Sequence, residues 1–325
     1  MKYKVIEGID KPLSTLVFGA SYAAVVGNKD DAFKIYDMVW EAGFRTFDTA
    51  HSYGNCEAVL GEWLESRNYR SEAVILDKGC NPGQKGGTEP GEGLNAQTIR
   101  SQLEMSLKRL RTDHVELYVL HRDDPSVPVD ETVEILNELK KEGKLLKFGG
   151  SNWTFKRVLE VQAYADQHGL EGFSAVSPAF SMARYIQDPW GGSVALSGDE
   201  QADYRAWLAA NQMPVFAYSS LARGYLSGKF RPDGDRPIEE CLYSAPIIEY
   251  DSPDNRERLL RARALGEELG LTVPQIALAW LVHQPQNIYP LVTPTTLPHI
   301  MDNARALDIQ LTPAQIKWLA TGETA

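Results

Sequence analysis

The sequence predicts an α/β fold, a (β/α)8 TIM barrel with long loops on the face formed by the C-terminal ends of its strands. Short apolar runs rich in Val, Ile, Leu, Phe or Tyr alternate with helix-like stretches, as expected for buried parallel strands joined by helices. Repeated alternation of this kind indicates a closed barrel. The eight runs lie at about residues 16–20, 45–50, 73–78, 115–120, 146–150, 173–177, 214–219 and 288–292.

Several of the intervening stretches have helical spacing and recognisable helix ends. Apolar residues recur at three and four positions within the ranges 95–109, 128–143, 257–269 and 274–282. Gly143 suits the position after a helix end, and Pro274 suits a first helical turn. Near the C-terminus, Thr312 is expected to cap a last helix, with Gln315 three residues later.

Three stretches are too rich in glycine and proline for regular structure, namely residues 81–93, 188–198 and 228–253. Insertions that follow barrel strands rim the open face, so we expect these stretches to be lids over a substrate and a cofactor. The chain has no low-complexity tract and no short-period repeat beyond the βα alternation. We therefore expect residues 1–325 to form a single barrel domain with elaborated loops.

The composition is that of an ordinary globular protein with an acidic surface. Of the 325 residues, 43% are apolar, and the formal net charge is −11. This charge argues against general affinity for nucleic acid or for an anionic membrane. The N-terminus lacks the apolar core of a signal peptide and no stretch has the length of a membrane span, which favours a cytoplasmic location. The scattered cysteines suggest neither a disulfide framework nor a metal site, and the oligomeric state stays open.

Four residues at or just beyond the ends of apolar runs can carry chemistry: Asp48, Tyr53, Lys78 and His121. Because the strand ends of a parallel barrel open onto one face, we expect these side chains to converge. A tyrosine phenol has a pKa of about 10. A nearby lysine ammonium should lower that pKa, while a paired carboxylate keeps the lysine charged. His121 is suited to donate a hydrogen bond to a carbonyl oxygen.

With these residues in place, the chain resembles the aldo-keto reductase superfamily from end to end. The resemblance rests on the segment FDTAHSYG, which contains Asp48 and Tyr53, and on the strand-end Lys78 and His121, in the family's order and rough spacing. It implies NAD(P)H-dependent reduction of a small aldehyde or ketone, or the reverse, with no Rossmann domain. Tyr53 would be the general acid, Lys78 and Asp48 its tuning pair, and His121 the group that orients the carbonyl. The polar loops and the segment HRDDP favour a polar, sugar-like substrate.

The resemblance also implies coenzyme contacts, while a GxGxxG fingerprint is missing. The segment GGSNW matches the Ser151–Asn152 pair that grips the nicotinamide carboxamide, although either residue could instead cap the next helix. The segments FAYSSLARGYLSGK and LVTPTTLPHIMDN match further coenzyme contacts. These are Tyr218 as the ring stacked on nicotinamide, Ser219, Leu221 and Arg223 near the pyrophosphate, and Asp302 and Asn303 at the adenine.

Two departures from the family pattern bear on the coenzyme. Ser177 stands where most members have a glutamine beneath the carboxamide, and a hydroxyl reaches less far. Thr293 and His299 stand where members that prefer NADPH carry lysine and arginine for the 2′-phosphate. A neutral pair is a weaker partner for a dianion. The preference between NADPH and NADH is therefore open.

Two other functions stay open at this point. Lys78 could condense with a carbonyl substrate, as in a Schiff-base lyase or aldolase, although Asp48 nearby would keep it protonated. The chain could also be a nicotinamide-binding regulatory protein.

Two residues are expected to face a substrate. They are Tyr22, after the first strand, and Trp153, directly after Asn152.

Overall fold

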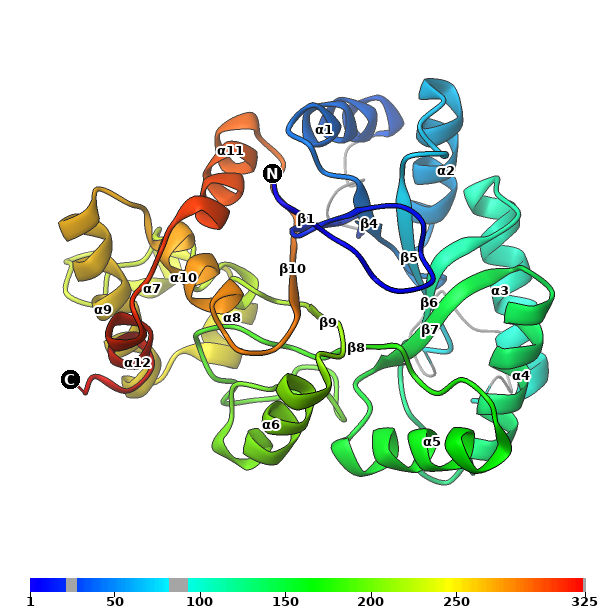
Figure 1. Cartoon of the computed structure of the whole chain (residues 1–325). Coiled ribbons are helices and arrows are strands. Elements are labelled where there is room, and N and C mark those ends of the chain that lie inside the picture. Colours follow the sequence, from blue (N-terminus) through cyan, green and yellow to red (C-terminus); the bar gives the residue numbers. More distant parts are fainter. Residues whose placement is uncertain (22–27, 82–92, 324–325) are drawn as a thin grey trace. The chain divides into compact units, whose positions relative to one another are not determined.

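The apolar runs form the strands of a closed parallel barrel, which confirms the predicted fold class (Figure 1). This computed structural model describes residues 1–21, 28–81 and 93–323. The order around the barrel is β10-β3-β4-β5-β6-β7-β8-β9. The strands are β3 (Val17–Gly19), β4 (Thr46–Asp48), β5 (Val74–Gly79), β6 (Val115–Leu120), β7 (Leu145–Ser151), β8 (Ala175–Ser177), β9 (Val215–Ala217) and β10 (Ile288–Val292).

Helices connect these strands, and a short antiparallel pair, β1 (Tyr3–Lys4) and β2 (Leu13–Ser14), precedes them. The first helices are α1 (Lys29–Glu41), α2 (Cys56–Arg67), α3 (Ala96–Leu110), α4 (Val129–Lys141) and α5 (Phe155–His168). The later ones are α6 (Ala202–Asn211), α7 (Ile238–Cys241), α8 (Ser244–Tyr250), α9 (Pro253–Leu269), α10 (Val273–Val282), α11 (Leu297–Arg305) and α12 (Pro313–Thr321). The helices α3, α4 and α10 confirm the ranges predicted from helical spacing to within two residues, and α9 confirms the predicted helix but begins earlier.

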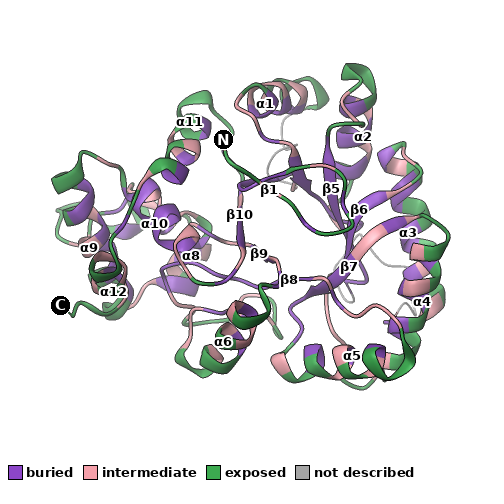
Figure 2. Cartoon of the chain, in the orientation of Figure 1, coloured by how far each residue is buried: buried purple, intermediate pink, exposed green. Residues whose placement is uncertain are grey.

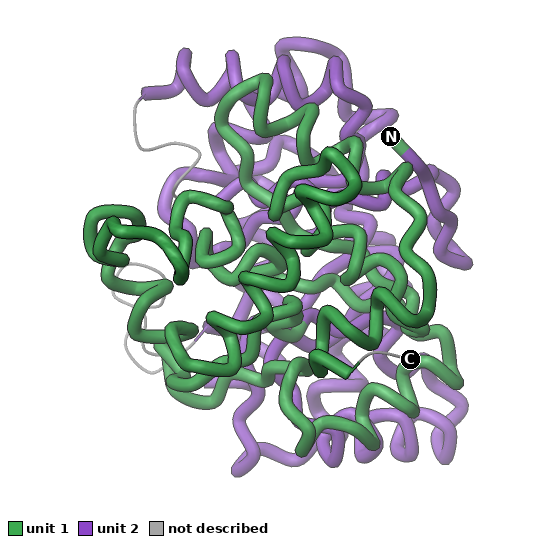
Figure 3. The backbone as a smooth tube through the Cα atoms, turned by 90° about the vertical axis from the view of Figure 1, so that its left-hand side faces the viewer, with its two compact units in different colours: residues 1, 178–325 green, residues 2–177 purple. Residues whose placement is uncertain are grey.

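The chain divides into two compact units, coloured separately in Figure 3. Unit 1 comprises Met1 and Pro178–Ala325, and unit 2 comprises Lys2–Ser177. The expectation of a single domain over residues 1–325 stays a prediction. We describe each unit by itself.

Unit 2 contains the strands β3 to β8 with the helices α1 to α5. The strands β3 to β6 are buried along their whole length, and the helices expose only their outer faces (Figure 2). An aromatic cluster joins the helices to the strands, with the ring of Trp63 on α2 lying 5.4 Å from Phe47 on β4 and 5.2 Å from Tyr36 on α1. At Gly79 the Tyr118 hydroxyl approaches so closely that a Cβ atom would lie 1.8 Å from its oxygen, so only glycine fits this strand position.

Unit 1 contains the parallel pair β9 and β10 with the helices α6 to α12. Side-chain caps define its helix starts. Thr312 accepts a hydrogen bond from the Gln315 backbone and Gln315 reciprocates, which confirms the predicted cap of α12. Thr272 forms the same capping box on α10, and Ser252 caps α9, which therefore begins at Pro253, before the predicted residue 257.

One of the three irregular stretches is predicted wrongly. Residues 228–253 contain the helices α7 and α8. The α8 helix buries Pro246, Glu249 and Tyr250, so packing outweighs the low helical propensity of the local sequence. Residues 188–198 hold no regular helix or strand. Residues 82–92, most of the first stretch, lie outside the described residues.

Candidate active site

A buried ion pair joins the ends of two neighbouring strands in unit 2. Asp48 is the last residue of β4, and Lys78 is the fifth residue of β5, paired in parallel with β4. The ammonium of Lys78 donates a hydrogen bond to the Asp48 carboxylate, and each residue is 3% exposed. Burial is the largest effect on the pKa of Lys78 and acts to lower it, but the charge and hydrogen bond of Asp48, together with smaller contributions from other neighbours, outweigh burial and raise that pKa above its usual value. Lys78 is therefore an ammonium at neutral pH.

Tyr53 lies in the turn between β4 and α2, beside this ion pair. Backbone hydrogen bonds from Thr49 to Leu76, 2.9 Å, and from His51 to Lys78, 2.7 Å, tie the turn to β5. The Lys78 Nζ atom is 5.3 Å from the centre of the Tyr53 ring. The ring is half-buried, and its hydroxyl is the atom that Lys78 contacts by a hydrogen bond.

The pKa of Tyr53 differs from the sequence-based expectation. Burial raises this pKa above its usual value, and the charge and hydrogen bond of Lys78 only partly oppose that effect. The Asp48 carboxylate adds to the rise. The expected lowering by Lys78 is present, but the expected net direction is wrong because burial is the larger effect. The phenol is therefore protonated at neutral pH.

His121 directly follows β6 and faces the tyrosine. Its backbone N–H donates to the Gly79 carbonyl on β5, 2.7 Å, and its ring lies 5.6 Å from the Tyr53 ring at an interplanar angle of 80°. Burial, followed by the charges of Lys78 and Arg122, holds the pKa of His121 well below its usual value. Its Nδ1 atom is buried and finds no hydrogen-bond partner among the described residues. A neutral imidazole can donate through one ring nitrogen, as carbonyl orientation requires.

A row of hydrogen bonds links the ends of β6, β7 and β8. Ser151 donates from its hydroxyl to the Ser177 carbonyl, 2.8 Å. The side-chain amide of Asn152 donates to the Ser151 hydroxyl, 3.1 Å, and to the His121 carbonyl, 3.3 Å. Neither Ser151 nor Asn152 caps α5, because Thr154 does so by accepting from the Arg157 backbone. The capping alternative is therefore excluded, and this polar row stays the candidate carboxamide site.

The two candidate substrate residues have different outcomes. Tyr22 lies outside the described residues. Trp153 is 1% exposed, with its ring edge-to-face on Phe173 at 4.8 Å and the Arg157 guanidinium 5.3 Å from the ring centre. This environment favours a packing role, and a substrate role for Trp153 stays a prediction.

The predicted pyrophosphate residues lie in the loop after β9, in unit 1. Ser219 and Arg223 both have positive φ, +51° and +53°, a conformation that is strained outside glycine. Arg223 donates to the buried carboxylate of Glu249 on α8, and its guanidinium lies 5.0 Å from the Trp190 ring centre. The expected anion clamp thus already has a carboxylate partner. Tyr218 and Leu221 are both partly exposed in the same loop.

The predicted adenine-side residues lie around the start of α11. Thr293 and His299 are exposed, as a phosphate contact requires. Asp302 accepts a hydrogen bond from Thr272 of the α10 cap, 2.9 Å, so one carboxylate oxygen supports a neighbouring helix. Asn303 is buried, 5% exposed.

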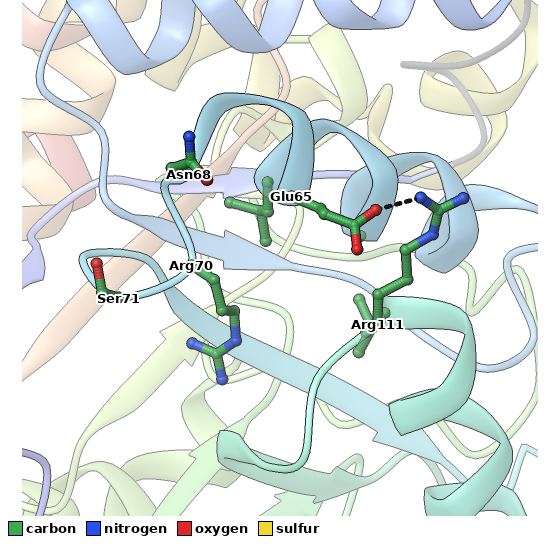
Figure 4. Close-up of a pocket in the computed structure, with 8 residues that line it drawn as sticks. Glu65, Asn68, Arg70, Ser71 and Arg111 are labelled. Carbon is green, nitrogen blue, oxygen red and sulfur yellow. Dashed lines mark hydrogen bonds and ion pairs between the residues drawn. The ribbon is translucent and has the colours of Figure 1, made fainter.

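Other features of the described residues carry no site chemistry. The described ranges hold no cluster of three His, Cys, Asp or Glu side chains that could bind a metal. No helix among them is long and apolar enough to cross a membrane. A groove at the C-terminal ends of α2 and α3 contains charged side chains, but Arg111 pairs with Glu65 there (Figure 4). Arg70 donates to the Thr112 hydroxyl, the Glu116 carboxylate and the backbone carbonyls of Ala73 and His114.

Three functional candidates escaped the sequence analysis: Glu57, Asp77 and Glu249. All three side chains are buried and titratable, with exposed fractions of 2% or less. Asp77 interrupts an apolar strand directly before Lys78, a signal that was available in the sequence. Glu57 lies in an ordinary-looking helical segment and Glu249 in a stretch that was expected to be irregular, so only the fold reveals that both are buried.

Comparison with known proteins agrees with this geometry. The profile of the aldo/keto reductase family matches residues 15–321. The chain is 29% identical over 324 residues to the uncharacterized oxidoreductase YrpG of Bacillus subtilis (strain 168), covering 96% of this chain and 92% of that protein. It is 28% identical over 316 residues to the norsolorinic acid reductase stcV of Emericella nidulans, and the match covers 94% of this chain and 75% of that protein.

A solved structure shows the same fold. The crystal structure of a thermostable aldo-keto reductase in complex with the inhibitor epalrestat matches with a TM-score of 0.72 and 19% identity over 99% of each chain. Together, the family profile and the relatives define an NAD(P)-dependent oxidoreductase built on a barrel. The chain belongs to the aldo/keto reductase family.

Proposed function

We propose that this protein reduces the aldehyde or ketone of a small carbonyl substrate to an alcohol, or catalyses the reverse, with Tyr53 as the general acid. The observation that carries the proposal is the buried Lys78–Asp48 pair with Tyr53 and His121 around it at the ends of β4, β5 and β6. Three of these side chains have the protonation state that carbonyl reduction needs: Tyr53 is a phenol, Lys78 an ammonium and His121 a neutral imidazole. Burial raises the pKa of Asp48, and the charge and hydrogen bond of Lys78 oppose that rise.

The roles follow from that arrangement. Tyr53 donates its phenolic proton to the carbonyl oxygen, which becomes the alcohol oxygen. The Lys78 ammonium stabilises the tyrosinate left behind, and Asp48 holds the ammonium in place. Neutral His121 donates a hydrogen bond to the same carbonyl oxygen and orients it toward Tyr53.

The polar row formed by Ser151, Asn152 and Ser177 fits a nicotinamide carboxamide. A carboxamide needs both a donor and an acceptor, and these side chains supply both types within a few ångströms of each other. A reduced nicotinamide held there would supply the hydride for the carbonyl carbon. In unit 1, Tyr218 would stack on the ring, and Ser219, Leu221 and Arg223 would hold the pyrophosphate.

The coenzyme preference depends on Thr293 and His299. Both are exposed near the start of α11, where a 2′-phosphate would benefit from a helix N-terminus but would meet no lysine or arginine at these two positions. Asp302 and Asn303 would contact the adenine. We infer that NADH is used at least as readily as NADPH.

The first experiment is a titration of the purified protein with NADPH and with NADH, followed by quenching of tryptophan fluorescence. The proposal predicts saturable binding of at least one coenzyme, and coenzyme-dependent reduction when small polar carbonyl compounds, sugars included, are added. A strong advantage for NADPH would contradict the inference about Thr293 and His299. Binding of neither coenzyme would remove the reductase proposal.

The Schiff-base lyase is the competing function, and the raised pKa of Lys78 speaks against it because condensation needs a neutral amine. Borohydride treatment in the presence of a carbonyl substrate separates the two. A stable adduct on Lys78 would favour the lyase, whereas the reductase predicts none.

A further inference from the structure

A second set of buried charged groups lies behind the strand that carries Lys78. Asp77 precedes Lys78 on β5 and points to the opposite face, since neighbouring strand residues alternate. Glu57, in the first turn of α2, lies against it, and both are 0% exposed. We call Asp77 and Glu57 the carboxyl pair.

The charges around the carboxyl pair do not balance if both members are ionised. Arg109 on α3 donates to Glu57 Oε2 at 2.8 Å. Lys78, the neighbour of Asp77, is engaged by Asp48. The other groups that face Asp77 are the Ser106 hydroxyl on α3 and the Tyr118 phenol on β6, both neutral.

Buried like charges in contact cannot both persist, so one carboxyl of such a pair holds a proton. The proton belongs on Asp77, because Glu57 has the arginine and Asp77 does not. Burial first, and then the charge of Glu57, raises the pKa of Asp77 well above its usual value, in agreement with this assignment.

Arg109 connects the carboxyl pair to the turn that carries Tyr53. Its Nη1 atom lies 3.2 Å from the His51 carbonyl oxygen, two residues before Tyr53, and 2.8 Å from Glu57, four residues after it. His51 is itself bonded through its backbone to Lys78. One guanidinium therefore spans the turn from both sides of Tyr53.

We propose that Asp77 is protonated and donates a hydrogen bond to Glu57, and that the Glu57 carboxylate orients Arg109 as a positioning residue that clamps the Tyr53 turn. The inference rests on the proposed function for its catalytic consequence. A shift of the phenol by an ångström is enough to slow proton transfer strongly. None of these three groups is among the residues proposed to contact the substrate or the coenzyme.

The first test replaces Arg109 by Met and by Lys, with Arg100→Met as the matched control. Arg100 is on the same helix α3 but pairs with Glu138 and Glu142 at the surface. We expect Arg109→Met to lower kcat about 10- to 100-fold with an unchanged coenzyme Kd, and Arg109→Lys to recover part of the loss. Equal kcat for Arg109→Met and Arg100→Met would overturn the clamp.

The second test measures the pH dependence of urea unfolding for the wild type, for Asp77→Asn, and for Asp203→Asn, a control at a surface position of α6. The folded wild type keeps a proton that the unfolded chain loses above about pH 4, so its stability should decline as pH rises above about 4, until the pKa of Asp77 in the folded protein is passed. Asp77→Asn carries a permanent donor and should lack this decline. Parallel curves for the wild type and Asp77→Asn would overturn the protonated carboxyl.

The two failures are distinguishable. A wild type that neither binds nicotinamide coenzyme nor reduces a carbonyl would sink the proposed function, while the unfolding curves would still report on the carboxyl pair. A wild type that turns over normally, with Arg109→Met equal to its control, would sink the clamp alone.

Discussion

At the scale of single residues, Tyr53 shows how burial and charge compete at one hydroxyl. Lys78 acts to lower the pKa of Tyr53, whereas burial and the charge of Asp48 act to raise it. The net effect is a raised pKa, so the phenol stays protonated. A phenol that is protonated at rest and has an ammonium beside it to stabilise the tyrosinate suits a general acid.

Tyr53→Phe removes the proton and leaves the ring in place. We expect kcat to fall about 100- to 10,000-fold, the range that general acid catalysis supplies, with the coenzyme Kd within about twofold. Tyr164→Phe is the control, because it removes a surface hydrogen bond to Glu134 far along α5. Steady-state kinetics with a coenzyme titration measures both quantities, and near-normal turnover in Tyr53→Phe would contradict the assigned role.

Lys78→Met leaves the Asp48 carboxylate buried without its partner. Breaking a buried pair in this way costs about 3–5 kcal/mol, whereas removing both charges costs much less. We therefore expect the double variant Lys78→Met, Asp48→Asn to recover most of the stability lost by Lys78→Met. Turnover should be abolished in both variants, because both lack the ammonium beside Tyr53. Urea unfolding and kinetics on the same preparations test this, and an equally unstable double variant would be the contrary result.

At the scale of elements, the loop after β9 and the helix α8 are coupled by one ion pair. Glu249 is 2% exposed and has its second oxygen buried with no hydrogen-bond partner among the described residues. Its carboxylate occupies the guanidinium that the proposed pyrophosphate contact needs. The α8 helix, which the sequence did not predict, thus places a negative charge beside Arg223, which the sequence did predict as a pyrophosphate contact.

Glu249→Gln keeps an acceptor for Arg223 and removes the negative charge. We expect coenzyme to bind several-fold more tightly, since a phosphate no longer competes with a carboxylate for the guanidinium. The matched control is Glu240→Gln on α7, an exposed residue whose Arg236 partner is 3.8 Å away. Fluorescence titration of both variants decides the matter, and weaker binding in Glu249→Gln would mean that the carboxylate positions Arg223.

At the scale of the whole molecule, the stability of the barrel depends on a charged cluster near the start of β6. Glu116 is 0% exposed and accepts from Lys11 at 2.6 Å, from Arg70 at 2.8 Å and from the Ile75 backbone at 2.8 Å. Burial opposes its ionisation, but a hydrogen bond from His114 and the charges of Arg70 and Lys11 hold its pKa at about 2. This charged cluster and the proposed catalytic residues thus lie at opposite ends of the strands.

This depressed pKa predicts how acid destabilises the protein. Stability from Glu116 is present above the unfolded pKa, near 4.5, and is lost as pH falls through about 2. Glu116→Gln should therefore cost about 3 kcal/mol at pH 7, and the difference from the wild type should vanish near pH 2. Glu65→Gln, at an exposed pair with Arg111, should cost less than about 1 kcal/mol. A difference for Glu116→Gln that does not depend on pH would contradict this account.

Particular elements show which parts of the structure were predictable. The α12 cap was predictable from the sequence because Thr312 and Gln315, which form it, are only three positions apart. The strand ends were readable because apolar runs stop at Asp48, Lys78 and His121. The α8 helix was not, because its burial depends on contacts with distant segments, such as the Glu249 carbonyl that accepts from Ile186.

The sequence by itself determined the βα alternation, the cap of α12 and the candidate residues at or just beyond the strand ends, because each of these depends on neighbours within a few positions. Only the tertiary structure decided that Tyr53 stays protonated, that Glu249 pairs with Arg223, and that Asp77 meets Glu57. Burial and long-range charge set these states, and both depend on which distant segments the fold brings into contact.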